Sequence, residues 1–309
     1  MKEGRIRLLR GEYEAGWAGY EHRLALRKFA RVRERFDEPR WDGAPLAGQT
    51  ILLHAEQGFG DTLQFIRYAP LVAARGGAVA VECPPSLASL VGSVEGVARV
   101  IEQGAALPPF ACQAPLLSLP RILATDMDSI PADIPYLAPP PGPPPPPLVE
   151  AGEGFRVGIV WAGNPDHADD RNRSCGLAAF APLRALGGVR LYGLQVGPRA
   201  ADLQSLPPGP PVIDLSPWLS DFAATARAMQ ALDLIVTVDS APAHLAGALG
   251  RPAWVLLPFV PDWRWLLERD DSPWYPSLRL FRQPTFGDWP AVFERVAASI
   301  ATLTRRPGG

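Results

Sequence analysis

Two blocks of alternating strand-like and helix-like segments constrain the fold of this chain more than any other feature. Short apolar runs separated by segments with helical spacing are typical of βαβ units, which form parallel sheets. A nine-residue run, Pro139 to Pro147, contains eight prolines and separates the two blocks. The sequence therefore predicts an α/β protein with two parallel sheets. The expected strands are residues 51–54, 78–81 and 99–101 in the first block and 156–161, 190–195, 234–238 and 253–257 in the second.

Helical spacing is clearest in the last segment, where Val292, Phe293, Val296, Ile300 and Leu303 share one face. Such an amphipathic face predicts a helix that packs against the rest of the chain. The expected helices are residues 62–74, 221–231 with Ser220 as the N-cap, 242–249 and 289–303.

The two ends of the chain and the proline run complete the predicted organisation. Consecutive prolines adopt the polyproline II conformation, which suits a linker. Residues 1–40 hold 11 basic and 7 acidic side chains and show helical spacing that Gly11 and Gly16 interrupt. We therefore expect a helical extension over residues 1–40, a first α/β half over 41–138, a linker over 139–154, a second α/β half over 155–286 and a C-terminal helix over 287–309 that packs back.

Composition argues against several classes of protein. The formal charge of the 309 residues is −2, which does not suit a nucleic-acid-binding protein. The three cysteines lie far apart without a Cys-x-x-Cys pair, and the four histidines are scattered, so we expect no disulfide framework and no bound metal. No apolar run reaches 18 residues, and the first ten residues are too charged for a signal peptide. We expect a cytoplasmic protein without an integral membrane segment.

The turn after the first expected strand carries a candidate general base. Gly58-Phe-Gly60-Asp61-Thr-Leu63 begins like a dinucleotide-binding fingerprint, but Leu63 occupies the third glycine position, which leaves an NAD-linked oxidoreductase as a weak alternative. The Asp61 carboxylate could accept a proton from a substrate, and it could also cap the following helix. His54, at the end of the strand, is a rival base or a plain strand-end residue.

The most hydrophobic strand, residues 234–238, leads into Asp239-Ser240-Ala-Pro242-Ala-His244, which opens a helix. A helix N-terminus at the carboxyl edge of a parallel sheet offers free N–H groups and the positive end of the helix dipole. Pro242 fits the first turn, where its missing N–H is not needed. The segment predicts a phosphate or diphosphate site. Alternatively, Asp239 or Ser240 only caps the helix and His244 is a core residue.

A second candidate for anion binding follows the strand at 156–161. Gly163 and Asn164 permit close approach of the backbone to a ligand, and the guanidinium groups of Arg171 and Arg173 could neutralise phosphate charge. The alternative is an ordinary solvated loop with exposed arginines.

Aromatic residues gather after the strand at 253–257. Exposed rings in this region could stack on sugars or bases, and they could equally fill an interface between the two halves. The residues concerned are Trp263, Trp265, Trp274 and Tyr275.

Four segments, residues 60–68, 161–174, 214–226 and 238–252, form an ordered set along the chain. Together they resemble the catalytic domain of glycosyltransferase family 9 (heptosyltransferase-like), in the bacterial branch linked to tetratricopeptide repeats. The resemblance runs from about residue 50 to residue 303, and its most specific part is the Asp-Ser-x-x-x-His-Leu-Ala sequence at 239–246. Residues 9–23 resemble the closing unit of a tetratricopeptide array, of which the chain shows no second copy.

The resemblance implies a GT-B fold of two Rossmann-like halves, with the nucleotide sugar held mainly by the second half and the acceptor by the first. It implies that Asp61 is the catalytic base and that an arginine, Arg171 or Arg173, stands where related enzymes place a basic residue on the phosphates. The residues expected to bind the nucleotide sugar are Gly163, Asn164, Arg171, Arg173, Ser174, Gln195, Asp214, Asp239, Ser240, Ala241 and His244, and those expected on the acceptor side are Gly60, Gln64 and Arg67.

The expected function is transfer of a sugar from a nucleoside-diphosphate donor to an acceptor hydroxyl, with inversion at the anomeric carbon. The nucleotide sugar is a co-substrate, and we expect no metal or other cofactor. The acceptor would be a glycan, a lipopolysaccharide core or a protein, and not a nucleic acid. The alternative is a catalytically inactive GT-B-like module that binds other proteins, which the repeat-like N-terminus and the proline run would suit.

Overall fold

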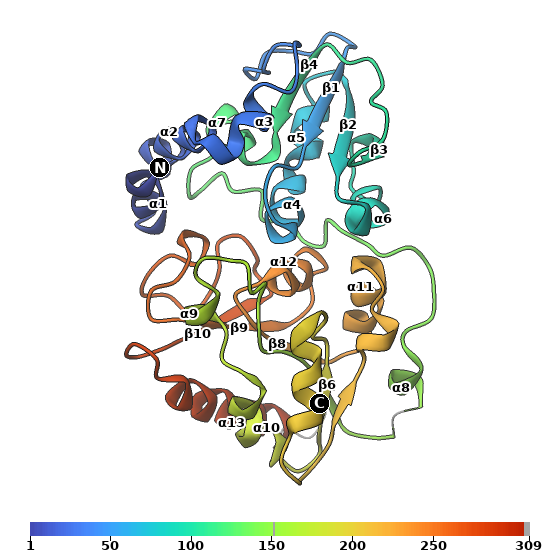
Figure 1. Ribbon diagram of the computed structural model, residues 1–309, viewed down its shortest axis with the longest axis vertical. Coiled ribbons are helices and arrows are strands. Elements are labelled where there is room, and N and C mark those ends of the chain that lie inside the picture. Colours follow the sequence, from blue (N-terminus) through green and yellow to red (C-terminus); the bar gives the residue numbers. More distant parts are fainter. Residues whose placement is uncertain (151, 306–309) are drawn as a thin grey trace. The chain divides into compact units, whose positions relative to one another are not determined.

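A computed structural model describes residues 1–150 and 152–305 and divides the chain into two compact units, each built around a parallel sheet (Figure 1). Ala151 and residues 306–309, which the predicted linker and the predicted final segment include, lie outside the described residues. The predicted α/β class is confirmed. Unit 1 consists of Met1–Pro140, Asp262–Glu268 and Pro273–Pro276, and unit 2 consists of Pro141–Pro261, Arg269–Ser272 and Ser277–Gly309.

In the part of the chain that the structure describes, the sheet of unit 1 has four parallel strands in the order β3-β2-β1-β4 (Figure 1). The central strand β1 is buried from Ile51 onward because its apolar residues lie inside the unit. β4 is not among the expected strands, since its sequence Cys-Gln-Ala-Pro contains no apolar run. The strands are β1 (Thr50–His54), β2 (Ala78–Cys83), β3 (Val97–Glu102) and β4 (Cys112–Pro115).

The helical stretch expected over residues 62–74 is present, but the structure divides it into three pieces. Pro70 lacks an N–H, and its ring would clash with the carbonyl four residues earlier in a continuous helix. The chain forms α4 (Phe59–Phe65), a 3₁₀ turn at Ile66–Tyr68 and α5 (Ala69–Ala73). The remaining helices of unit 1 after β1 are α6 (Ala88–Val91) and α7 (Leu119–Ile122).

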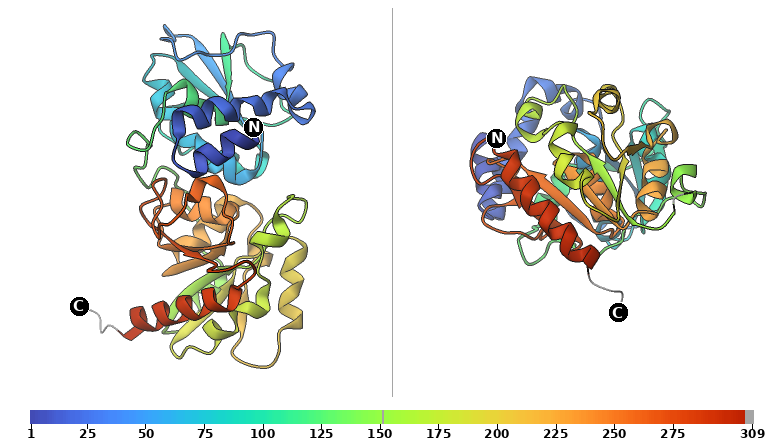
Figure 2. Two further views of the ribbon diagram at one scale, coloured as in Figure 1. Left: turned by 90° about the vertical axis from the view of Figure 1, so that its left-hand side faces the viewer. Right: turned by 90° about the horizontal axis from the view of Figure 1, so that it is seen from below.

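The N-terminal segment forms a helical hairpin, in which α1 (Lys2–Leu9) and α2 (Tyr13–Glu21) lie side by side (Figure 2). Gly11 ends α1 with a φ of +77°, a conformation that favours glycine. Gly16 does not interrupt the helix as expected. It lies inside α2, where a Cβ atom would approach the Leu8 side chain to 2.7 Å, so its role is to allow close packing. Two 3₁₀ turns (His22–Ala25 and Arg27–Phe29) and α3 (Ala30–Arg33) follow.

An aromatic cluster holds this hairpin inside unit 1. The Trp17 indole N–H donates to the Thr125 carbonyl at 2.9 Å, and its ring lies 5.2 Å from that of Trp263 and 6.4 Å from that of Trp274. Of the two alternatives for the Trp and Tyr residues that follow residues 253–257, exposed rings are therefore wrong, because these side chains form part of the core of unit 1. The buried residues of the two late segments are Trp263, Trp265, Trp274 and Tyr275.

His54, the rival base, lies buried at the end of β1. Its Nε2 is 3.0 Å from Gln113 Oε1, and its ring packs on Phe36. Burial lowers the pKa of His54 from 6.5 to about 4. These surroundings favour the plain strand-end role.

The buried His54 makes a prediction for acid stability. The unfolded chain binds a proton on this imidazole below pH 6.5, whereas the folded chain does so only near pH 4, so folding loses stability as pH falls through that window. Between pH 7 and pH 4, we expect the free energy of unfolding of wild type to fall by on the order of 3 kcal/mol more than that of His54→Gln. Urea unfolding at each pH measures this difference. The exposed His22 serves as the control, and His22→Gln should follow wild type. Parallel curves for wild type and His54→Gln would contradict the prediction.

Within residues 152–305, the sheet of unit 2 has six parallel strands in the order β10-β9-β8-β5-β6-β7 (Figure 1). The four expected strands are present. The two edge strands are not among those expected, because β7 has only three residues and β10 alternates leucine and phenylalanine with arginine. The strands are β5 (Phe155–Val160), β6 (Val189–Gly193), β7 (Val212–Asp214), β8 (Leu234–Val238), β9 (Ala253–Leu257) and β10 (Leu278–Arg282).

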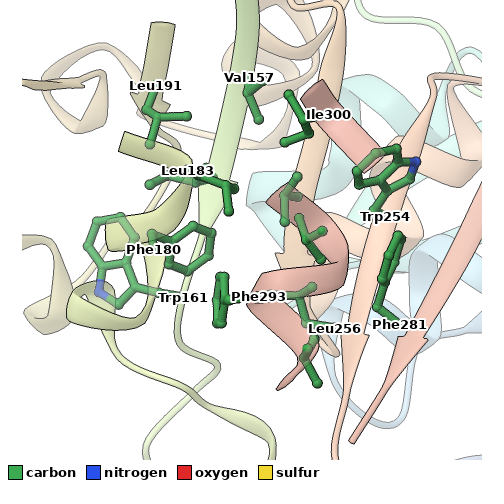
Figure 3. Packing of buried hydrophobic residues seen from close by; sticks show 14 of the residues in the cluster. Val157, Trp161, Phe180, Leu183, Leu191, Trp254, Leu256, Phe281, Phe293 and Ile300 are labelled. Atoms are coloured by element: carbon green, nitrogen blue, oxygen red, sulfur yellow. The ribbon is translucent and has the colours of Figure 1, made fainter. Parts of the chain in front are cut away.

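The core of unit 2 packs α13 (Trp289–Arg305) against the sheet (Figure 3). Phe293 of α13 lies 4.7 Å from the Phe180 ring, and Ile300 is fully buried. Leu303, expected on the same face, is 43% exposed because it lies in the last turns beyond the sheet contact. The other helices are α8 (Pro146–Val149), α9 (Asp170–Arg173), α10 (Ala181–Arg184), α11 (Phe222–Gln230) and α12 (Ala241–Ala248).

Two local predictions in unit 2 need correction. The N-cap of α11 is Asp221 and not Ser220, since the Asp221 carboxylate accepts the Ala224 N–H at 2.7 Å. The last two prolines of the proline run, Pro146 and Pro147, begin the helical turn α8, where proline fits at the first positions. No helix among the described residues is long and apolar enough to cross a membrane.

Candidate active site

Asp61 lies in the first turn of α4, directly beyond the carboxyl end of β1. The N-cap of α4 is Gly58, so the expectation that Asp61 is the N-cap is wrong. Its Oδ2 accepts the Gly58 N–H at 2.9 Å, which reinforces the helix start from the third helical position. The side chain keeps 20% of its surface exposed, so a substrate hydroxyl can reach it.

The other carboxylate oxygen of Asp61 pairs with the guanidinium of Arg264. Arg264 is buried, and it also donates to Asp262 Oδ1 at 2.8 Å and to the Gln64 side-chain oxygen. Burial by itself would lower the pKa of Arg264, but the charges of Asp262 and Asp61 raise it above its ordinary value. In the sequence, this region stands out for its aromatic residues. The opposite charges of Asp262 and Arg264, two residues apart, are the signal that could have indicated its role in ion pairing.

A buried carboxyl, Glu56, precedes Asp61 in the turn between β1 and α4. Its side chain is completely buried, and its Oε1 accepts a hydrogen bond from Arg23 at 2.7 Å. Burial raises the pKa of Glu56 to about 7. Arg23 also donates to Ser118 Oγ at 2.9 Å, so a residue from the N-terminal extension supports the turn that carries Asp61. Glu56 is not among the site residues expected from the sequence.

The residues expected on the acceptor side take different positions in unit 1. Gly60 lies in the first turn of α4. Gln64 is buried and accepts from Arg264. The Arg67 guanidinium is buried and donates to the carbonyls of Gln64 and Trp274 at 2.8 and 2.6 Å. Arg67 thus joins α4 to the segment Pro273–Pro276, and an acceptor role for these residues stays a prediction.

In unit 2, hydrogen bonds connect the loop after β5 to the start of α12. The Gly163 N–H donates to Ser174 Oγ at 3.0 Å, and this hydroxyl donates to Asp170 Oδ1 at 3.0 Å. Asp170 accepts from Arg173 Nε at 3.3 Å, and Arg173 Nη1 donates to the Asp239 carbonyl at 3.1 Å. The structure therefore brings together the two predicted anion-binding segments.

Glycine is required at one point of this network. A Cβ atom at Gly163 would lie 2.5 Å from the Arg173 guanidinium and 2.6 Å from Asp170 Oδ1. Arg173 is half-buried in this position, whereas Asn164 and Arg171 are exposed in the loop. Of the two candidate arginines, Arg173 is therefore the one fixed beside α12.

The Ser240 side chain does not cap the first turn of α12. Ser240 is the N-cap residue, but its Oγ donates to the Val238 carbonyl at 3.2 Å instead of accepting from the helix. Ala241 begins the helix, and Asp239 and His244 are largely buried. The arrangement leaves the positive end of the helix dipole beside Arg173, which suits an anion.

Two further predicted residues lie at the carboxyl ends of the neighbouring strands β6 and β7. Gln195 is buried, and its Oε1 accepts from the backbone N–H groups of Trp161 and Ala162 at 3.2 and 3.0 Å, so it holds the start of the loop after β5. Asp214, at the end of β7, is exposed and accepts the Ser216 N–H at 2.8 Å. Ligands of α/β proteins bind at this carboxyl edge.

Comparison with known proteins adds sequence evidence for the same region. Residues 199–256 match the family model "Glycosyltransferase family 9 (heptosyltransferase)". In this segment the chain is therefore similar to glycosyltransferase family 9. The segment matched includes β7, α11, β8 and α12, and so contains the predicted anion-binding helix start.

One curated relative and two solved structures extend this relationship. Protein FlbA of Caulobacter vibrioides is 27% identical over 326 residues, which cover 96% of this chain and 53% of FlbA, so the chain spans about half the length of this relative. The structure of ADP-heptose lps heptosyltransferase II of E. coli superposes with a TM-score of 0.58 at 16% identity, covering 82% of this chain and 98% of that one. A family 9 glycosyl transferase from Veillonella parvula gives 0.59 at 9% identity, covering 85% and 100%. These likenesses establish a GT-B-like heptosyltransferase fold.

Proposed function

We propose that the chain transfers a sugar from a nucleoside-diphosphate donor to an acceptor hydroxyl. The observation that carries this proposal is the hydrogen-bonded network from Gly163 through Arg173 to Asp239, which fixes a cation beside the start of α12. The relationship to family 9 supports it. ADP-heptose, after which the similar E. coli heptosyltransferase is named, is the donor to test first.

The donor diphosphate binds at the start of α12 in this proposal. Backbone N–H groups near Ser240 and Ala241, the helix dipole and the Arg173 guanidinium offset its negative charge. His244, buried in the same first turns, lines this site. Gly163 contributes by leaving room for Arg173.

The reaction proceeds by a single in-line displacement. The acceptor oxygen bonds to the anomeric carbon, the bond from that carbon to the diphosphate oxygen breaks, and the acceptor proton passes to Asp61. The charge that develops on the diphosphate is stabilised by α12 and Arg173, without a metal ion. One displacement inverts the anomeric configuration, and NMR analysis of the product would detect retention if this were wrong.

The acceptor is a glycan, a lipopolysaccharide core or a protein. We further propose that α1 and α2 are a remnant of a tetratricopeptide unit, which would favour a protein acceptor.

Binding of nucleotides tests the donor site directly. A ligand at 100 times its Kd stabilises the folded state by about 2.7 kcal/mol, so we expect ADP to raise the Tm of the purified chain by several degrees in a thermal-shift assay. UDP, GDP, CDP, CMP and NADH are compared in parallel. We expect Arg173→Gln and Gly163→Ala to lose the shift, because the first removes the cation and the second displaces it.

The exposed Arg279 on β10 supplies a matched control, and Arg279→Gln should keep the full nucleotide shift. A shift that survives in Arg173→Gln would remove Arg173 from the donor site. If no nucleotide shifts the Tm of wild type, the glycosyltransferase proposal fails and the protein-binding module becomes the better explanation.

A further inference from the structure

We propose that Arg264 is a positioning residue for Asp61, which its guanidinium holds in one orientation. This inference rests on the proposed function, because it concerns the same carboxylate. Arg264 belongs to the segment Asp262–Glu268, which lies in unit 1 together with Asp61 although 203 residues separate the two.

The guanidinium of Arg264 is held from several directions. It donates to Asp61, to the side-chain oxygen of Gln64 and to Asp262 Oδ1, and it lies over the Trp263 ring at 4.3 Å. Its side chain is only 9% exposed. Because the donors of a guanidinium form a rigid planar fork, fixing three of its contacts also fixes where the fourth group, the Asp61 carboxylate, must lie.

Asp262 does not compete fully with Asp61 for this positive charge. Its other oxygen, Oδ2, pairs with Arg5 of α1 at 3.1 Å. Burial by itself would raise the pKa of Asp262, but Arg264 and Arg5 together hold it below its ordinary value. Arg5 therefore offsets part of the negative charge of Asp262. As a result, Asp262 does not fully neutralise the Arg264 guanidinium, which also pairs with Asp61.

The pairing leaves Asp61 able to accept a proton. A carboxylate offers about four lone pairs, of which the Gly58 N–H uses one on Oδ2 and Arg264 uses one on Oδ1. The exposed fifth of the side chain gives a hydroxyl access to the remainder. Glu56, itself paired with Arg23, and the Tyr20 hydroxyl also interact electrostatically with Asp61.

A double-mutant cycle tests whether Arg264 acts through Asp61. The readout is ADP release from ADP-heptose with water as the acceptor, which requires no knowledge of the natural acceptor. We expect Arg264→Gln to lower kcat by about 10- to 100-fold, as for a misplaced catalytic group, with KM for the donor changed less than about twofold. Arg264→Lys should recover part of kcat, because it restores the charge without the fork.

In the Asp61→Asn background, Arg264→Gln should cause no further loss, since the group that it positions is already absent. Equal losses in both backgrounds would overturn the proposal, as would a higher kcat in Arg264→Gln, which would make the ion pair inhibitory. If Arg264→Gln does not fold, Arg264→Lys is measured in both backgrounds and carries the same test. Arg269→Gln, in the following exposed Arg269–Asp271 pair, is the matched control and should leave kcat unchanged.

The outcome also separates this inference from the proposed function. If Asp61→Asn keeps full activity, the base assignment itself is wrong. If Asp61→Asn is inactive but Arg264→Gln is fully active, the proposed function stands and only the role of Arg264 is lost. The thermal shift with ADP should persist in every variant of Asp61 and Arg264, because the donor site is built from unit 2 residues.

Discussion

Asp61→Asn should abolish most of the sugar transfer while leaving nucleotide binding intact. Loss of a general base costs about 10²- to 10⁴-fold in rate, and we expect kcat for ADP release from ADP-heptose to fall within that range. The amide cannot take up the acceptor proton, but it matches the carboxylate in size and can still accept the Gly58 N–H. The structure of the turn after β1 should therefore survive the change.

Controls separate this effect from loss of charge or of fold. Asp126 is an exposed aspartate of unit 1 that accepts backbone N–H groups of its own loop, and Asp126→Asn should leave kcat unchanged. The Tm shift caused by ADP should be the same in wild type and Asp61→Asn. Full activity of Asp61→Asn would exclude Asp61 as the base, whereas loss of the ADP shift would mean that the variant is damaged beyond its chemistry.

Trp17→Ala should be the most destabilising change in the N-terminal extension. Trp17 is buried against Trp263, Trp274 and Phe65, and its indole N–H is bonded to the Thr125 carbonyl. Truncating a buried tryptophan removes its apolar contacts and leaves a cavity, at a cost of about 3–5 kcal/mol. We expect a fall of this size in the free energy of unfolding, measured by urea denaturation.

Trp218 offers a matched tryptophan, because it is 41% exposed in unit 2. Trp218→Ala should change the free energy of unfolding by less than about 0.5 kcal/mol. A similarly small change for Trp17→Ala would mean that α1 and α2 are dispensable for the core of unit 1. The expected result instead makes residues 1–29 part of that core.

Some site residues carry a local sequence signal and others do not. Asp61 and the Asp239–His244 segment lie where a strand passes into a helix. Such a transition can be predicted from neighbouring residues, because an apolar run is followed closely by residues that begin a helix. Arg264 does not lie at such a transition, and its pairing with Asp61 joins distant parts of the chain. Glu56 does lie in the turn that precedes the helix of Asp61, but its partner Arg23 is also distant in the sequence. The aromatic residues of 262–276 gave a clear compositional signal, but composition does not say whether a ring faces solvent or a core.

By itself, the sequence determined the elements that depend on short-range periodicity: the central strands β1, β5, β8 and β9, the amphipathic helix α13 and the start of α12. Its family motifs also pointed to the GT-B-like fold. Only the tertiary structure decided that Arg264 pairs with Asp61, that Arg173 and not Arg171 is fixed beside α12, and that Trp17 packs on Trp263 and Trp274. The physical reason is that hydrophobic periodicity reports one element's own buried face, whereas ion pairs and ring contacts depend on which distant segments share a core.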